Sequence, residues 1–232
     1  MISKSVTRKS FVAAAALSAV IGLSACGSND VDTAAAADTS SSSASYGRPA
    51  PVATVAAIPG GSTAVALDTG FTDALTTLGL TPGTVGGATL DGATGTISFP
   101  MTGGEVTLYD RESGYRPWVQ GTLFHEGSGL SLTAGATTVE LTDFTIDPGK
   151  PARLFGNVSV NGTLAAASAP LFNLDGSTLN PPTMDADGSA VLQGTTVKLS
   201  DEAAALLNST FGTDALAGGF VIGTATVTVE TK

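Results

Sequence analysis

The chain has 232 residues and a formal net charge of −10, from 10 basic and 20 acidic side chains. This acidic balance excludes a protein that binds nucleic acid through a basic surface. A single Cys and a single His exclude a disulfide framework, and they exclude a zinc site built from Cys and His within one chain. We therefore predict no metal site, no cofactor and no nucleic-acid partner.

The N-terminus has the features of an export signal. Lys4, Arg8 and Lys9 precede residues 11–23, which are almost wholly apolar or small. At ~1.5 Å per residue, a helix of that length spans about 20 Å of the ~30 Å hydrocarbon core. The segment is therefore too short for a transmembrane helix and is typical of a signal peptide.

The signal ends in Leu23-Ser24-Ala25-Cys26. This string resembles the lipobox of bacterial lipoproteins, in which the signal is removed before the Cys and the thiol is acylated. The resemblance implies that residues 1–25 are a signal peptide and that Cys26 carries the lipid, including palmitate. We predict a protein anchored by lipid in the cell membrane or outer membrane, facing outside the cytoplasm. The alternative is a soluble secreted protein with a chance cysteine.

Beyond the signal, residues 26–61 are rich in Ala, Ser, Thr, Asp and Pro, with no helix or strand period. Such a composition buries too little apolar surface to offset its ordering entropy, so we predict a flexible tether. Without the signal the chain keeps 7 basic and 20 acidic side chains, a net charge of −13. An anionic membrane would repel it, so attachment to the membrane should depend on the lipid.

Residues 62–232 are predicted to form a β-rich domain. Short segments alternate apolar side chains with Thr, Ser or charged side chains, as antiparallel strands with one wet face do. Glycine-containing turns are predicted at residues 103–104, 127–129 and 161–162. We predict a mainly β fold, either an antiparallel sandwich or a partly closed barrel. The alternating segments are residues 63–67, 96–99, 105–109, 130–132, 138–146, 158–160, 197–199 and 225–229.

Two segments have helical periodicity instead. Residues 71–78 place apolar side chains at i, i+3, i+4 and i+7. A second segment has its apolar side chains at Ala203, Leu206, Leu207 and Phe211. Ser200 is a suitable N-cap for the second segment, and Asp201 and Glu202 are favourable in its first turn. The fold should therefore include two short helices.

Several strings in the β-rich region resemble a family of exported bacterial proteins, mostly without an assigned function. More distantly they are similar to the HtaA-type haem-uptake domains of actinobacterial surfaces, which share a Phe-Pro…Gly-Gly turn and a Gly-Leu-x-Leu strand. In the haem family an N-terminal Tyr near a Trp ligates iron, whereas the matching residues 71–78 contain neither. The resemblance implies the fold and makes haem one candidate ligand, but it supplies no iron ligand. The matching strings are residues 98–104, 129–132, 137–144, 170–175 and 222–227.

The inventory of catalytic groups is small. His125 is the only imidazole, so a Ser-His-Asp mechanism would have to use it, but no Gly-x-Ser-x-Gly motif supplies a nucleophile. We interpret His125 as a polar turn residue at the end of a strand and assign no catalytic residue. Asp185, Asp187 and Gly188 resemble the start of a calcium loop, but the later acidic ligands are missing, so an Asp-Gly turn is favoured.

The loop at residues 109–118 is the most distinctive segment. It gathers two of the three Tyr, the only Trp and two Arg in an otherwise aromatic-poor region. Aromatic rings beside Arg favour a binding surface, through stacking and cation–π contacts. In the alternative interpretation, the Trp folds back onto the core of a long hairpin. The candidate binding residues are Tyr109, Arg111, Tyr115, Arg116 and Trp118.

These features predict a lipid-anchored protein of the cell envelope that is a non-enzymatic binding or structural module. Its ligand is a small molecule, a glycan or another protein. The alternative is an envelope-associated hydrolase that acts on extracellular or cell-wall glycans. A cleft with two convergent carboxylates would favour the hydrolase, because glycoside hydrolysis uses such a pair.

Overall fold

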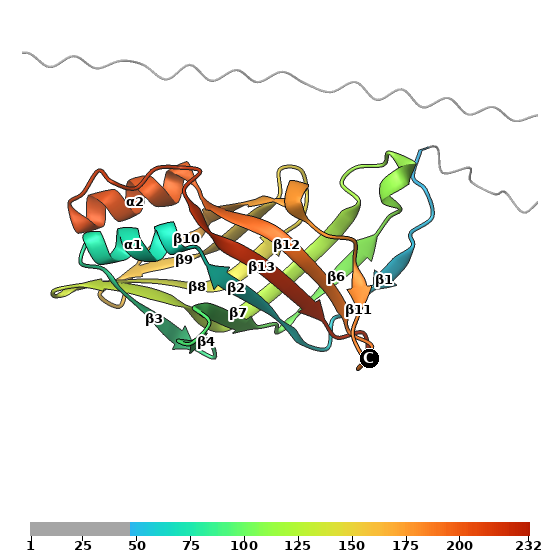
Figure 1. Cartoon of the computed structure of the whole chain (residues 1–232), viewed down its shortest axis with the longest axis horizontal. Coiled ribbons are helices and arrows are strands. Elements are labelled where there is room, and N and C mark those ends of the chain that lie inside the picture. Colours follow the sequence, from blue (N-terminus) through green and yellow to red (C-terminus); the bar gives the residue numbers. More distant parts are fainter. Residues whose placement is uncertain (1–46) are drawn as a thin grey trace, which may run out of the picture. The chain divides into compact units, whose positions relative to one another are not determined.

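The computed structural model describes residues 47–232, so the predicted lipid anchor at Cys26 and the predicted signal peptide lie outside the described residues. One antiparallel sheet contains all the strands, in the order β1-β6-β7-β8-β9-β10-β12-β13-β2-β5-β4, with β3 on β7 and β11 on β12 (Figure 1). The strands are β1 (Ala53–Val55), β2 (Gly61–Leu67), β3 (Thr81–Gly86), β4 (Thr89–Asp91), β5 (Thr96–Pro100), β6 (Gly103–Leu108), β7 (Val119–Ala134), β8 (Thr137–Asp147), β9 (Arg153–Val160), β10 (Thr163–Asp175), β11 (Thr183–Met184), β12 (Ala190–Leu199) and β13 (Val221–Val229).

The sheet curls so that its concave face closes partly on itself. Phe99 on β5 and Phe144 on β8 are far apart in the strand order, yet their rings pack edge to face with centroids 5.1 Å apart. Both rings are buried in the core. The prediction of a mainly β, partly closed antiparallel barrel is therefore confirmed.

The curl coincides with bulges in consecutive strands. In β8 the buried side chains are Val139 and Leu141, then Phe144 and Ile146, so the alternation shifts by one residue between the two pairs. Asp143 lies at this shift, with φ 54°. Such an extra residue bends a strand and increases its twist while returning the apolar side chains to the same face.

The side chain of Asp143 ties this bulge to the neighbouring strands. Its carboxylate accepts hydrogen bonds from the Gly127 amide (2.9 Å) and from Nδ2 of Asn157 (3.1 Å). Asn157 Oδ1 in turn accepts from the amide of Ser168 (3.0 Å). The bond from Gly127 is the main reason why the pKa of Asp143 is lowered. A row of polar contacts thus crosses β7 to β10 where the sheet bends.

Both predicted helices are confirmed, and they lie at one end of the sheet (left in Figure 1). Helix α1 (Thr69–Thr77) buries Phe71 and Leu75, and Asp68 caps it by accepting from the Gly70 amide. Helix α2 (Asp201–Phe211) begins after Ser200, whose hydroxyl accepts from the Ala203 amide at 2.9 Å, as the sequence predicted. Within residues 47–232, no helix has the length and apolar character needed to cross a membrane.

The structure corrects two of the predicted turns. Residues 127–129 lie within β7 as a bulge, and residues 103–104 begin β6. A bulge and a turn both use glycine at positive φ, here 69° at Gly127, so the sequence alone does not separate them. The turn at residues 161–162 is confirmed. Strand β1 lies in the segment for which the sequence predicted a tether, and it pairs with β6.

Candidate functional site

The concave face of the sheet encloses a cavity of about 610 Å³. Small-molecule sites in proteins have volumes of roughly 300–1,000 Å³ and are lined mainly by apolar side chains. The inward-facing residues of strands on both sides of the curl form the walls. They include Val65, Phe99, Phe144, Val197, Ala225 and Val227.

Three connections border the cavity along one edge of the sheet. They are residues 116–118 before β7, residues 148–152 between β8 and β9, and residues 176–179 after β10. In an antiparallel sheet of this order, alternate connections lie on the same edge, so segments distant in sequence meet there (upper side of Figure 1). We call this edge the rim.

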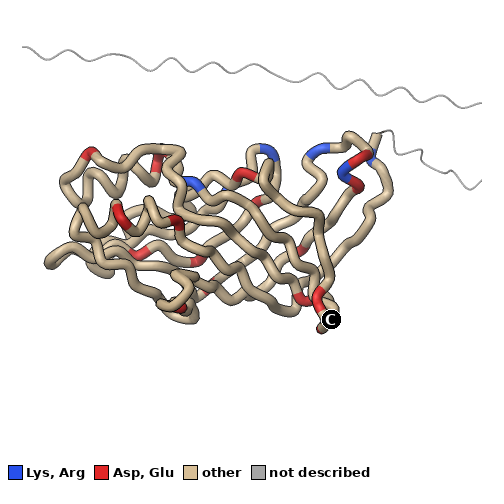
Figure 2. The backbone as a smooth tube through the Cα atoms, viewed as in Figure 1, with Lys and Arg blue, Asp and Glu red and all other residues tan. Residues whose placement is uncertain are grey.

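The charges that border the cavity have one sign. Arg116 and Lys150 are among its lining residues, and none of the acidic side chains in residues 47–232 is. Both cations are exposed, and neither forms an ion pair with another described residue. Arg116 Nη1 donates a hydrogen bond to the Tyr115 carbonyl at 2.8 Å. Figure 2 shows Lys and Arg segments gathered along the rim side of an otherwise acidic molecule.

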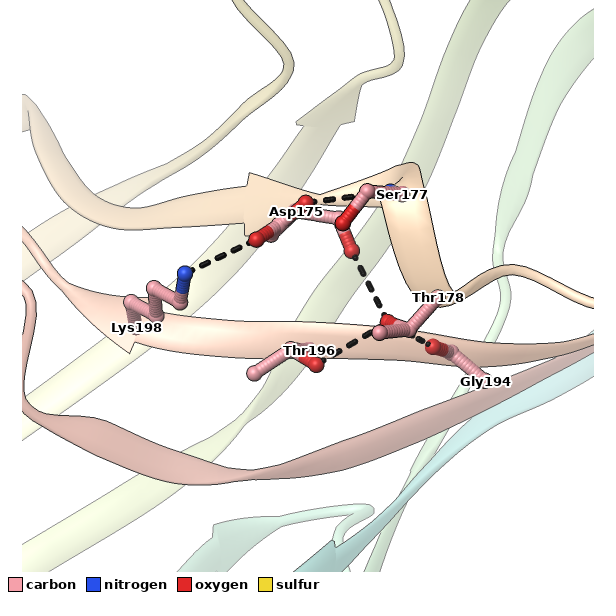
Figure 3. A network of polar contacts seen from close by, with 6 residues as sticks. All are labelled: Asp175, Ser177, Thr178, Gly194, Thr196 and Lys198. Carbon is pink, nitrogen blue, oxygen red and sulfur yellow. Dashed lines mark hydrogen bonds and ion pairs between the residues drawn. The ribbon is translucent and has the colours of Figure 1, made fainter.

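A polar network fixes the part of the rim formed by the short helix η2 (Gly176–Thr178) (Figure 3). Lys198 Nζ lies 2.8 Å from Asp175 Oδ2, and this contact lowers the pKa of the carboxyl well below its usual range. The Thr178 hydroxyl donates to the Gly194 carbonyl at 2.6 Å. Helix η2 is thereby fastened to β12, and the charge of Lys198 is compensated within the rim.

His125 is the polar group most deeply buried in the cavity wall. It lies within β7 and is only 1% exposed, so its interpretation as a polar turn residue was wrong. Its Nε2 is 2.9 Å from Oγ1 of Thr63. Burial lowers its pKa to about 4, and a backbone interaction with Phe144 opposes that shift. The ring is therefore neutral at pH 7, and Nδ1 has no hydrogen-bond partner among the described residues.

Of the five candidate binding residues in the loop at residues 109–118, the structure places two beside the cavity and three away from its lining. Arg116 and Trp118 line the cavity. Tyr109 is 2% exposed and packs against Tyr115, with ring centroids 4.8 Å apart. The guanidinium of Arg111 lies 4.8 Å from the centroid of the Trp118 ring. Arg116 and Trp118 thus border the cavity, whereas the other three residues contact aromatic rings of the same loop.

The side chains that line the cavity limit the chemistry that it can support. Glycoside hydrolysis requires two carboxylates across a cleft, and no carboxylate of residues 47–232 lines the cavity. In the same part of the chain, no three His, Cys, Asp or Glu side chains converge as a metal site would require. His125, Thr63 and Thr195 are polar side chains within largely apolar strand walls.

Comparison with known proteins finds similarity at the level of the fold. No protein-family model matches the chain, and no curated protein sequence is significantly similar to it. The C-terminal domain of HtaA from Corynebacterium glutamicum superposes with a TM-score of 0.50 at 14% identity, over 75% of this chain and 99% of that domain. The two share a fold. The haem-binding protein HtaB from the same organism has a TM-score of 0.47 at 11% identity, over 78% and 96% of the two chains.

Proposed function

We propose that this protein is a non-enzymatic binding module that takes a largely apolar small molecule into the curled sheet. The cavity of about 610 Å³ carries this proposal, because its size and apolar walls match those of small-molecule sites. Arg116, Trp118 and Lys150 line the cavity at the rim, so we expect the ligand to enter there. The absence of lining carboxylates among the described residues gives the glycan hydrolase no support.

Haem is one candidate ligand, because the sequence resembles HtaA-type haem-uptake domains. The cavity is large and apolar, and its wall holds the neutral imidazole of His125, so the residues present fit such a group. Bound haem supplies an iron that accepts a nitrogen ligand, and His125 is the described residue that would hold it. Phe99, Phe144 and Val197 would exclude water from the macrocycle.

Ligand entry should change the fluorescence of Trp118, because this is the only Trp of the chain and it lines the cavity. Titration with haemin, or with an apolar dye such as Nile red, should give saturable quenching. We expect Val227→Phe, which places a larger side chain in the cavity, to weaken binding at least about tenfold. Equilibrium titration of Trp118 fluorescence measures the dissociation constant.

The matched control is Thr224→Phe on the same strand. Thr224 is exposed and does not line the cavity, so the same bulk should leave affinity unchanged. Circular dichroism and thermal melts verify that both variants are folded. Equal weakening by the two variants, or no saturable binding of either probe, would contradict a binding site in the cavity.

We further propose that the module is held at the cell envelope by a lipid on Cys26, outside the cytoplasm. The string Leu23-Ser24-Ala25-Cys26 supports this, since it resembles a lipobox and an unpaired thiol in an exported chain suits acylation. Cys26→Ser should abolish metabolic labelling with a palmitate analogue, and the protein should leave the membrane fraction or stay unprocessed. Ser24→Ala, which keeps the thiol and a small residue, is the control. Undiminished labelling of Cys26→Ser would refute the anchor.

A further inference from the structure

We propose that the ligand is an amphiphile whose anionic group binds between Arg116 and Lys150 at the rim while its apolar body fills the cavity. This inference rests on the proposed function, and it names the chemical class of the ligand. Its geometric basis is that both cations line an apolar cavity that no described carboxylate lines.

The charge beside the cavity is opposite in sign to the net charge of the described residues. Residues 47–232 hold 17 of the 20 acidic side chains, since Asp30, Asp32 and Asp38 precede them. They hold 7 of the 10 basic ones, because Lys4, Arg8 and Lys9 lie in the signal. Acidic groups are thus in large excess, yet both charged groups at the cavity are basic.

The other basic side chains on the rim side already have partners within the protein. Arg48 lies over the ring of Tyr109 and donates to its hydroxyl, and Arg111 packs on Trp118. The remaining two have acidic partners: Lys198 with Asp175 at 2.8 Å, and Arg153 with Glu202 at 3.9 Å. Arg116 and Lys150 differ from these four because the structure gives neither an acidic nor an aromatic partner among the described residues.

The acid closest to Lys150 along the chain does not fill this role. Asp147 accepts a hydrogen bond from the Gly149 amide at 2.8 Å, which uses one carboxylate oxygen to close the β8–β9 loop. Asp147 does not line the cavity, whereas Lys150 does. The lining of the cavity therefore offers a bound carboxylate two cations and no described anion.

The walls select against fully polar anions. An anion without an apolar body would remain in water, because apolar side chains offer it no hydrogen bonds in the cavity. A neutral apolar molecule would contact the apolar walls but would leave both cations without a partner. An amphiphile uses both, with charge-assisted hydrogen bonds at the rim and apolar contacts inside. Fatty acids and tetrapyrroles with carboxylate side chains both have this chemistry.

Matched probes test the anionic group directly. Oleate and oleyl alcohol share one chain and differ in the head group, and protoporphyrin and its dimethyl ester differ in the same way. With the purified protein, we expect the carboxylate of at least one pair to bind about tenfold more tightly than its neutral analogue, by Trp118 fluorescence or calorimetry. The pair that shows the preference identifies the ligand as a single-chain lipid or a tetrapyrrole.

Removal of the rim charges should abolish this preference. In the double variant Arg116→Gln and Lys150→Gln, the carboxylate should lose about tenfold in affinity while the neutral analogue keeps its dissociation constant. Each single variant should lose about threefold. Lys232→Gln removes one positive charge from a residue that does not line the cavity, and it should leave both affinities unchanged.

The outcomes separate this inference from the proposed function. Equal binding of the acids and their neutral analogues, sensitive to Val227→Phe, would overturn the anionic ligand and leave the cavity as the binding site. A carboxylate preference that survives the double variant would overturn the assignment to Arg116 and Lys150. Binding of no probe by the wild-type protein, with the Nile red and haemin titrations also negative, would refute the proposed function itself.

Discussion

Lowering the pH from 7 to 4 should reduce the free energy of unfolding by about 3 kcal/mol through His125 alone. The pKa of His125 is lowered by burial to about 4 in the folded protein, from an ordinary value of 6.5. Between these two values the unfolded chain binds a proton that the folded chain does not. Stability therefore falls as the pH drops through this window, and it is unaffected by His125 above pH 7.

Denaturant unfolding at pH 7, 6, 5 and 4 measures this effect. The midpoint should fall steeply in the wild-type protein and much less in His125→Gln, which keeps a polar side chain without a titrating ring. Asp143 and Asp175 also have lowered pKa values, so their contributions are present above the ordinary Asp value and are lost only as the pH falls below about 4. Equal pH dependence in both proteins would show that His125 is not buried as described.

The ring of His125 offers a second measurement. Because the chain has one His, its ring protons give one titrating set in an NMR spectrum. The midpoint should lie near pH 4 and move further when a ligand occupies the cavity. A midpoint near 6.5 would contradict the burial of His125 in the cavity wall.

Phe144→Ala should cost about 3–5 kcal/mol of unfolding free energy. The Phe144 ring is 2% exposed and packs edge to face on Phe99, with centroids 5.1 Å apart. Truncation removes this contact and enlarges a cavity that the surrounding strands already leave open. For a domain of this size, the melting temperature should fall on the order of 10 °C or more, at ~2–4 °C per kcal/mol.

Phe124→Ala is the matched control, because it removes the same ring from a neighbouring strand. Phe124 is 38% exposed and lies opposite Thr145 in the pairing of β7 with β8. Its truncation should cost less than about 1 kcal/mol. Thermal melts of the two variants decide the matter. Similar losses would mean that Phe144 does not join the two sides of the curled sheet.

Much of the fold could be predicted because its signals are local. Alternation of apolar and polar side chains depends on neighbours two residues apart, and Ser200 caps its helix through Ala203, three residues away. Even the bulge at Asp143 has a local signal, since the apolar period shifts by one between Leu141 and Phe144. Residues 127–129 were misinterpreted because their glycines suit a turn as well as a bulge.

No comparable pattern in the sequence predicted the cavity. From the sequence, Val65, Phe144 and Val197 are predicted to be core residues in either case, whether the space between them is filled or empty. Whether a cavity forms depends on the curvature of the whole sheet. The sequence did not single out Lys150 either, because its place beside the cavity depends on three connections that are distant along the chain. His125 was placed at a strand end because the glycines after it suggested a turn, whereas β7 continues through them.

The alternation along β13 has a consequence for how such proteins diverge. Ala225 and Val227 face the interior, while Thr224 faces solvent. Substitutions at interior positions such as Ala225 and Val227 change the size and shape of the cavity. Substitutions at exposed positions such as Thr224 change only the outer surface. Under the proposed function, selection for a different ligand and selection on the outer surface therefore act on separate residues. Two related proteins can then differ in the ligand that they bind while their outer surfaces stay alike.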